Sequence, residues 1–257
     1  MNRLSFSRLR RAAAALVATA LLPAAPAFAI VGGGPAPADV AARTVMIVST
    51  RGASCTGTVL ARDLILTAAH CVGPKADYAV ALVGGGAPQL IPALRVALNP
   101  GFDAEQFRTR RPTPDLALVK LAEPLPARFV PATLAANNGL PARGASFLIA
   151  GYGMTADGAE KTAGTLRAVP LASVGNTGGI MTRLSPAEGG GAMLAGACTG
   201  DSGGPAFEGN VVSGVIGWVT APNGARGCGG VTGITLVGLQ RGWIIATARS
   251  LGSPVGD

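Results

Sequence analysis

Histidine is almost absent from this 257-residue chain: His70 is the only one, and the four cysteines include no Cys-x-x-Cys pair. A zinc or similar centre needs several such ligands at short spacing, so we expect no metal site and no cofactor. Tracts rich in lysine or arginine are absent too, which argues against a nucleic-acid partner. The nearest approach, Arg108 with Arg110 and Arg111, lies in a Pro/Thr-rich loop and is interpreted as solvated surface.

No long apolar run is available to span a bilayer, because the apolar stretch of residues 12–22 is too short and prolines follow it. The positive segment before it has no acidic residue and contains Arg3, Arg8, Arg10 and Arg11. Ala27-Phe28-Ala29 gives the small-x-small pattern of a cleavage site. We interpret residues 1–29 as a secretory signal peptide, and expect a secreted protein, periplasmic or extracellular, without stable membrane insertion after cleavage.

Cleavage after Ala29 leaves 228 residues (257 minus 29), enough for one two-lobed unit with a sizeable core. Four basic residues leave with the signal, so the formal net charge falls from +8 to +4, from 17 basic and 13 acidic residues. Four cysteines in an exported chain favour two disulfides, and the sequence permits three pairings. The local solution joins Cys55 to Cys71 and Cys198 to Cys228, each bridge contributing about 2–4 kcal/mol.

After residue 30, short apolar runs alternate with Gly, Pro, Asn and Asp. β-branched residues recur in these runs, and their spacing is typical of the hairpins of an all-β barrel or sandwich. A proline-rich stretch, about 123–143, is interpreted as the connection between two β lobes of similar size. Only the end, about 239–251, has helical character, with Trp243 and Ile244 on its docking face.

A glycine-rich stretch from Cys198 to Pro205 carries Ser202. A serine becomes a good nucleophile only beside a base, with donors for the developing oxyanion and a backbone that exposes the hydroxyl. Gly200 and Gly203 permit the tight turn that such exposure needs. On its own, however, the stretch could equally be an ordinary loop in a glycine-rich protein.

Two further residues complete a candidate catalytic set. His70 is the only imidazole available as a general base near neutral pH, although a lone histidine is more often structural. Asp115 could orient that histidine, or could simply start a strand after a proline turn. The chain order His, Asp, Ser favours the catalytic interpretation, whereas an α/β-hydrolase has its histidine last.

Three stretches resemble the signatures of the trypsin/chymotrypsin family of serine endopeptidases. They are Thr67-Ala68-Ala69-His70-Cys71, Asp115-Leu116-Ala117-Leu118-Val119-Lys120-Leu121 and Gly200-Asp201-Ser202-Gly203-Gly204-Pro205. The similarity extends from Ile30 to about Ser250 and includes Gly151-Tyr152-Gly153, where the family usually has Gly-Trp-Gly. Residues 30–257 are therefore identified as one trypsin-like serine protease domain, of a secreted, bacterial-type member.

The resemblance implies an all-β fold of two six-stranded antiparallel β-barrels, with the active site in the cleft between them and a C-terminal helix. The first barrel would span about 30–125 and the second about 144–240. It further implies that Ser202 attacks the scissile carbonyl of a protein or peptide while His70 takes its proton and Asp115 orients His70. The N–H groups of Gly200 and Ser202 would form the oxyanion hole. We expect a monomer.

The same resemblance suggests a mode of activation. Ile30-Val31-Gly32-Gly33 looks like the family's mature N-terminus, and it directly follows the expected cleavage site. The new α-amino group of Ile30 would form an ion pair with Asp201, so signal peptidase itself would be the activating protease. The alternative is that this sequence is merely an ordinary strand start.

The family's specificity pocket would lie beside Ser202, and the residues implied are Gly196, Gly217, Trp218, Val219 and Gly230. Trypsin-like enzymes carry an aspartate at the base, where Gly196 stands here, so a preference for Lys or Arg is disfavoured. Val219 would narrow the entrance and favour small or medium apolar residues. Gly230 leaves space for larger apolar ones, and Arg226 at the rim could recruit acidic ones.

One departure from the family concerns the aspartate. Gly217 stands where a serine hydroxyl usually supports it, so Asp115 would rely on water or another donor. The alternative function is a catalytically inactive secreted binding protein on the same scaffold. Such relatives usually lose a triad member, and this chain keeps all three.

Overall fold

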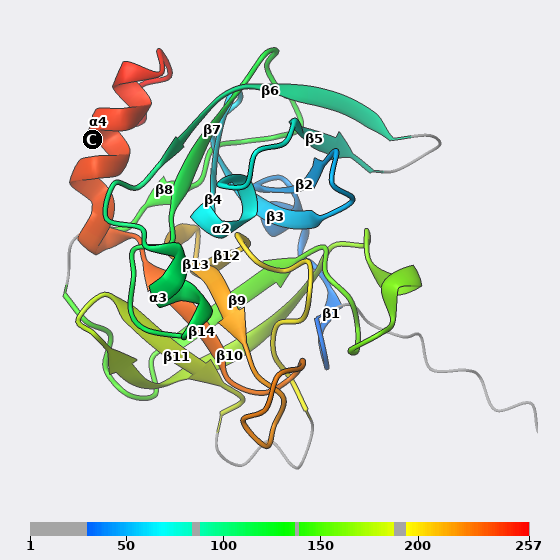
Figure 1. The fold of residues 1–257 in the computed structure, drawn as a ribbon, viewed down its shortest axis with the longest axis vertical. Helices are drawn as coiled ribbons and strands as arrows, with labels where there is room; N and C mark the ends of the chain where they lie inside the picture. The colour runs from blue at the N-terminus through cyan, green and yellow to red at the C-terminus, as the bar shows by residue number, and fades with distance from the viewer. Residues whose placement is uncertain (1–29, 84–87, 137–138, 188–193, 257) are drawn as a thin grey trace, which may run out of the picture.

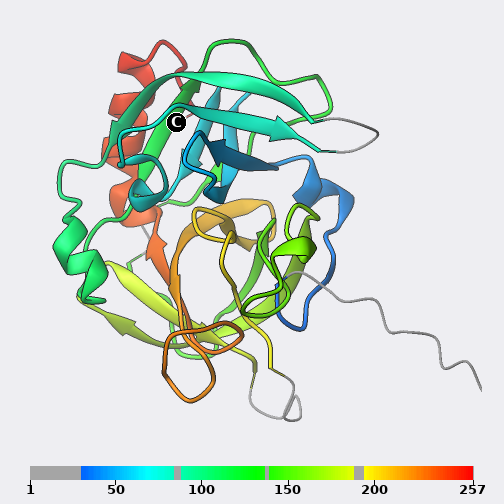
Figure 2. The same cartoon turned by 45° about the vertical axis from the view of Figure 1, so that its right-hand side comes forward.

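The computed structural model describes residues 30–83, 88–136, 139–187 and 194–256, so the expected signal peptide, residues 1–29, lies outside the described residues. Within these ranges most regular structure is β-strand, and the strands form two barrels, one above the other in Figures 1 and 2. No helix in the described part of the chain is long and apolar enough to cross a membrane.

The first barrel is a closed ring of antiparallel strands in the order β2-β3-β4-β7-β6-β5. The strands are β2 (Thr44–Ser49), β3 (Ser54–Ala61), β4 (Leu64–Thr67), β5 (Tyr78–Leu82), β6 (Gln89–Leu98) and β7 (Ala117–Leu121). Successive side chains of a strand point to opposite faces. Ile65 therefore packs inside this barrel, while Leu64 and Leu66 pack into a core that the two barrels share.

The second barrel is a ring in the order β9-β10-β11-β14-β13-β12, closed where β12 pairs with β9. The strands are β9 (Ser146–Gly151), β10 (Arg167–Thr177), β11 (Met181–Ser185), β12 (Pro205–Glu208), β13 (Val211–Val219) and β14 (Thr232–Leu236). Two short strands extend it. β1 (Gly34–Pro35) pairs with β10, and β8 (Thr133–Leu134) pairs with β13 in parallel, which the sequence did not predict.

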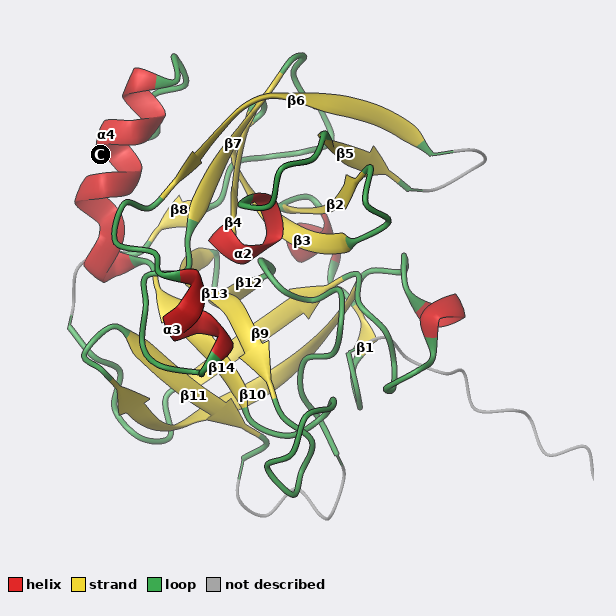
Figure 3. Cartoon of the chain, in the orientation of Figure 1, coloured by secondary structure: helices red, strands yellow, loops and turns green. Residues whose placement is uncertain are grey.

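Helices are short and lie outside the barrels (Figure 3). In the described ranges they are α1 (Ala38–Ala41), α2 (Ala69–Val72), α3 (Ala104–Arg108), α4 (Arg241–Ser250) and the 3-10 turns η1 (Glu160–Thr162) and η2 (Gly238–Gln240). Ile244 and Ala248 of α4 pack into the shared core. The predicted fold, two six-stranded antiparallel barrels and a C-terminal helix, is confirmed; the α-helix itself begins at Arg241, after a 3-10 turn.

Candidate active site

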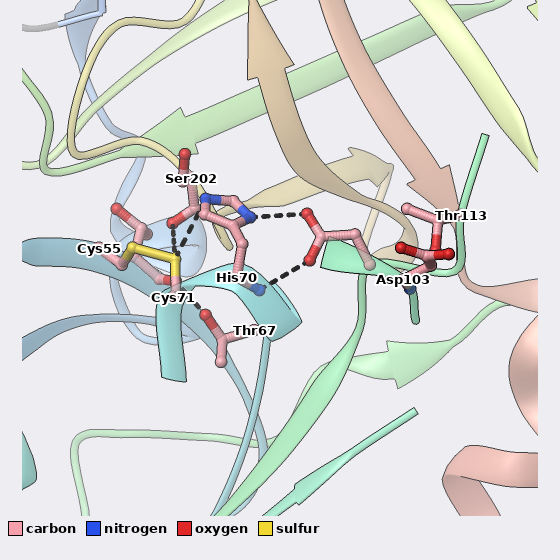
Figure 4. A network of polar contacts seen from close by, with 9 residues as sticks. Cys55, Thr67, His70, Cys71, Asp103, Thr113 and Ser202 are labelled. Atoms are coloured by element: carbon pink, nitrogen blue, oxygen red, sulfur yellow. Dashed lines mark hydrogen bonds and ion pairs between the residues drawn. A yellow bond between two sulfur atoms is a disulfide. The ribbon is translucent and has the colours of Figure 1, made fainter. Parts of the chain in front are cut away.

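His70 and Asp115 come from neighbouring strands of the first barrel. β4 ends at Thr67 and leads into α2, which contains His70, while Asp115 stands just before β7. The pairing of Thr67 with Ala117 brings these two strand ends together. Nδ1 of His70 lies 2.6 Å from Oδ2 of Asp115, and the backbone N–H of His70 donates to Oδ1 at 2.9 Å (Figure 4). Because an ionised carboxylate only accepts, Nδ1 carries the hydrogen of this contact.

The Asp115 side chain is 1% exposed, and His70 is the only described residue that donates to it. A hydrogen on Nδ1 leaves Nε2 as the ring's acceptor. Gly217 lies beside the pair, since a Cβ there would be 3.4 Å from Oδ2 of Asp115. The backbone of His70 therefore supplies the second hydrogen bond to a carboxylate that has no serine beside it.

The loop that carries Ser202 is fixed by the first barrel. Thr56 on β3 donates its N–H to the carbonyl of Ser202 at 2.8 Å and its hydroxyl to the carbonyl of Gly200 at 2.9 Å. Thr67 fixes Thr56 in turn, because its hydroxyl donates to the Thr56 carbonyl at 2.8 Å. Gly203 passes so close that a Cβ would lie 2.1 Å from the Thr67 hydroxyl, so no larger residue fits there. The position of the serine loop thus depends on contacts across the two barrels.

The N–H groups of Gly200 and Ser202 remain available for a ligand. Both carbonyls accept from Thr56, and neither N–H donates to any described residue. Gly200 has a φ of +97°, a left-handed conformation that glycine adopts without strain. A pair of uncommitted backbone donors beside a candidate nucleophile is what an oxyanion hole requires.

Ser202 and the outer ring nitrogen of His70 share a neighbour. Sγ of Cys71 lies 3.7 Å from Nε2 of His70 and 3.6 Å from the carbonyl oxygen of Ser202 (Figure 4). The Cys55–Cys71 disulfide links β3 to α2. It therefore connects the helix that contains His70 with the strand whose Thr56 binds the carbonyl of Ser202. Oγ of Ser202 forms no hydrogen bond with any described residue; such catalytic contacts often tighten only when substrate binds.

Asp201 is completely buried beside Gly151-Tyr152-Gly153. Its two carboxylate oxygens accept the N–H groups of Gly153 and Cys198, each at 2.8 Å. A Cβ on either glycine of that motif would lie 2.1 or 2.6 Å from the carboxyl group. Burial raises the pKa of Asp201 to about 7, and the two N–H groups and the more distant charge of Arg167 oppose this only in part. No described cation forms an ion pair with Asp201.

Ile30 is also completely buried, within the second barrel's core cluster that includes Ala197. The carbonyl of the next residue, Val31, accepts the N–H of Gly196 at 3.1 Å. Ile30 has a φ of +50°, which is strained for a β-branched residue. Ile30, the start of the expected mature chain, therefore packs in the same core cluster as Ala197. The next residue, Cys198, donates its N–H to Asp201.

The expected pocket base is built from backbone. A Cβ on Gly196 would lie 2.7 Å from the carbonyl of Gly230 and 3.2 Å from the hydroxyl of Thr232, so these segments touch. None of these three residues carries a charge. Trp218 and Val219 lie together in the wall of a neighbouring cavity that also includes Arg226. The structure thus brings Gly196 to Gly230, whereas Gly217 lies next to Asp115.

Two side chains near the site were missed at the sequence level. Phe107 of α3 stacks on the ring of His70, with centroids 4.2 Å apart and planes inclined by 13°. The guanidinium of Arg110 lies 6.0 Å from the centroid of the Trp218 ring. No family motif includes this loop, so the sequence offered no signal for either contact.

Cys55, His70 and Cys71 bring possible ligand atoms within 4.8 Å of one another. Both sulfurs are joined in a disulfide, however, so neither is a thiolate able to bind a metal ion. The second disulfide links Cys198 to Cys228, and the two bridges follow the local pairing.

Two closed six-stranded barrels with His70, Asp115 and Ser202 at their junction define the class of chymotrypsin-like serine proteases. The trypsin family model matches residues 30–239, and the chain belongs to that family. Trypsin alpha-4 of Lucilia cuprina is 26% identical over 213 residues, covering 77% of this chain and 79% of that protein. Trypsin alpha of Drosophila melanogaster is 28% identical over 214 residues, with the same coverage. Human kallikrein-11 is 29% identical over 184 residues, covering 65% of this chain and 63% of that protein.

A solved structure of a mutant of human heparin binding protein (CAP37) has a TM-score of 0.70 and 21% identity, covering 88% of this chain and 100% of that one. At this identity the likeness concerns the fold alone. The three relatives above come from flies and human, so the expectation of a bacterial-type member is not supported.

Proposed function

We propose that the chain is a secreted, monomeric serine endopeptidase that hydrolyses peptide bonds of proteins or peptides through an acyl-enzyme. The observation that carries this proposal is the contact of 2.6 Å between the buried Asp115 carboxylate and His70, beside the loop that contains Ser202. Asp115 keeps the hydrogen on Nδ1, so Nε2 takes the proton of Ser202 as Oγ attacks the scissile carbonyl. The free N–H groups of Gly200 and Ser202 bind the oxyanion, each lowering the barrier by roughly 3–4 kcal/mol.

The remaining steps return the proton. The tetrahedral intermediate collapses, Nε2 of His70 protonates the leaving amine, and the acyl group stays on Oγ of Ser202. Water then enters, His70 removes one of its protons, and the acyl-enzyme is hydrolysed to the acid and free serine. The stacked Phe107 shields one face of the imidazole from water throughout.

We propose a preference for small or medium apolar residues before the scissile bond. The absence of charge on Gly196, Gly230 and Thr232 supports this, because a lysine or arginine side chain would find no counter-charge there. Val219 narrows the entrance from the opposite wall. Larger apolar residues are the second choice; a Cβ on Gly230 would lie 2.4 Å from the carbonyl of Ala221, so this glycine serves close backbone packing.

Activation is proposed to follow cleavage between Ala29 and Ile30. The buried position of Ile30 and the raised pKa of Asp201 support it, because a new α-ammonium group would supply the charge that this carboxylate lacks. Cleavage would also release the φ constraint on Ile30. Asp201 lies between Gly200 and Ser202, so the ion pair would stiffen both oxyanion donors.

A fluorophosphonate probe tests the enzyme proposal, because only an assembled triad reacts with it. The form that begins at Ile30 should be labelled on Ser202, whereas Ser202→Ala and His70→Ala should lose labelling and most peptidase activity. The double variant should be little worse than either single one, and Ser250→Ala, on the exposed end of α4, should behave as the parent. A folded protein that is never labelled would overturn the proposal. Faster cleavage after Arg than after Ala or Val would overturn only the pocket assignment.

The second candidate is a catalytically inactive secreted binding protein. The fold match to a protein named for binding heparin favours it. The complete set of His70, Asp115 and Ser202, with the two free N–H donors, ranks it behind the protease. The same labelling experiment separates the two.

A further inference from the structure

A cavity of about 410 Å³ lies at the junction of the barrels, next to the candidate active site. Phe107, Arg108 and Arg110 line it from the first barrel, and Trp218, Val219 and Arg226 line it from the second. Phe107 is shared with the active site, because its other contact is the stacked ring of His70 at 4.2 Å. A peptide held by Ser202 would therefore pass beside this cavity, which we term the arginine pocket.

The arginine pocket is held in place by contacts between the barrels. Arg110 donates to the carbonyl of Gly224 at 3.4 Å and covers the ring of Trp218. A second anchor is Pro112, because a Cβ on Gly178 would lie 2.3 Å from its ring. Arg110 also has a φ of +56°, a strained conformation for this residue, and such strain persists where surrounding contacts over-determine it. Arg110 is exposed, as the sequence predicts, and its contacts with Gly224 and Trp218 also hold the loop against the second barrel.

The pocket carries uncompensated positive charge. Arg108 forms an ion pair with Glu105 of the same helix, but Arg110 and Arg226 have no acidic partner among the described residues. Both of their side chains are exposed, so their guanidinium groups can reach a ligand. Guanidinium groups match carboxylates in a bidentate geometry, and aromatic walls accept the apolar stem of a side chain.

We propose that the arginine pocket binds an acidic side chain of the substrate, at one of the second to fourth residues before the scissile bond. The inference rests on the proposed peptidase function and names a specificity that the pocket base does not provide. The expected pocket base, at Gly196, Gly230 and Thr232, carries no charge, whereas Arg110 and Arg226 line the arginine pocket together with Trp218. The enzyme then selects an apolar residue at the cleavage point with a carboxylate a short distance upstream.

The proposal is tested with a set of peptide substrates. All of them have the same apolar residue before the scissile bond, and they carry Glu, Gln or Lys at each of the three preceding positions in turn. At one position Glu should exceed Gln in kcat/KM by about five- to tenfold, and mostly through KM, because the contact is equal in ground and transition states. Added salt should shrink this ratio, since the arginines are exposed. Arg110→Gln and Arg226→Gln should each reduce the ratio by about three- to fivefold.

Arg249→Gln is the matched control, because Arg249 is exposed on α4 and outside the pocket, and it should leave the rates and the ratio unchanged. Equal cleavage of Glu and Gln peptides by a labelled, active enzyme would overturn the pocket proposal alone. The same conclusion would follow if both pocket variants kept the parental ratio. Arg226→Gln guards against misfolding of Arg110→Gln, because the Arg226 side chain makes no hydrogen bond or ion pair with a described residue.

If no peptide is cut and no probe is bound, the peptidase function fails and the pocket is still tested by binding. Fluorescence of Trp218, one of two tryptophans, would follow titration of the Ser202→Ala protein with the Glu and Gln peptides. Tighter binding of the Glu peptide, weakened by Arg226→Gln, would support the pocket. Equal binding of the two peptides would refute it.

Discussion

The carboxylate of Asp115 is held by a single residue. The ring and backbone N–H groups of His70 supply both of its hydrogen bonds from described residues, although the side chain is 1% exposed. A carboxylate has about four lone-pair sites, so two hydrogen bonds leave its desolvation incompletely compensated. Gly217 is the position from which a third donor could reach Oδ2, because a Cβ there would lie 3.4 Å away, at ordinary contact distance.

Gly217→Ser should therefore strengthen the His70–Asp115 pair. A hydroxyl that donates to Oδ2 adds a hydrogen bond to a charged group, so we expect the free energy of unfolding to rise by about 1 kcal/mol and kcat to rise a few-fold. Gly217→Ala adds the Cβ without the donor and is the matched control. Urea unfolding and steady-state kinetics of the two variants provide the measurement. Identical behaviour of the two would show that Asp115 needs no further donor.

At the level of elements, β3 makes hydrogen bonds to the candidate active site that its sequence does not predict. Besides its two bonds to the serine loop, Thr56 accepts the N–H of Tyr152 on its hydroxyl at 3.0 Å. The Thr56 side chain thus connects β3 with two segments of the second barrel, the loop that carries Ser202 and the segment around Tyr152. Two positions along, Thr58 is equally buried, but its hydroxyl has no hydrogen-bond partner among the described residues.

Thr56→Val should reduce activity far more than Thr58→Val, although both replace a buried hydroxyl by a methyl group on the same strand. Loss of the Thr56 hydroxyl frees the carbonyl of Gly200 and lets the oxyanion donors rotate, so kcat should fall about tenfold or more. Stability should fall by about 1–3 kcal/mol, because buried partners stay unsatisfied. Thr58→Val should be neutral or stabilising. Steady-state kinetics and thermal unfolding of the two variants, Thr56→Val and Thr58→Val, measure these effects. Equal losses of activity in the two would refute the role of Thr56.

The sequence predicted what local pattern determines, namely the short strands, the helical end near Trp243 and the motifs around His70, Asp115 and Ser202. It did not predict α3, with Phe107 on His70, or the parallel pairing of β8. The contact of Phe107 with His70 and the pairing of β8 join segments far apart in the chain, and no periodicity encodes them. The loop with Arg110 is exposed, as predicted, but its contacts with Trp218 and Gly224 were not predicted, for the same reason. The helix α3 itself has a local signal that the sequence analysis did not use, because the Asp103 side chain accepts the N–H groups of Glu105 and Gln106 at its start.

At the scale of the whole molecule, the proposed cleavage before Ile30 would change the charge balance of the buried core. In a chain with residues before Ile30, the Asp201 carboxylate accepts hydrogen bonds only from backbone N–H groups among the described residues, and burial raises its pKa to about 7. Folding then favours the protonated acid. The resulting stabilisation is fully present below the unfolded pKa of ~3.9 and is lost as pH rises through 7.

The last prediction compares Asp201→Asn in two forms of the protein, one with Met-Ala before Ile30 and one that begins at Ile30. In the extended form the parent should lose on the order of 3–4 kcal/mol of unfolding free energy between pH 4 and pH 8, and Asp201→Asn should remove this loss and stabilise the protein at pH 8. In the form that begins at Ile30, the α-ammonium group should compensate the carboxylate, so the same substitution leaves a buried charge unpaired and destabilises. Urea unfolding at the two pH values measures both. A substitution effect of the same sign in the two forms would contradict the ion pair between Ile30 and Asp201, and equal peptidase turnover would contradict activation by signal cleavage.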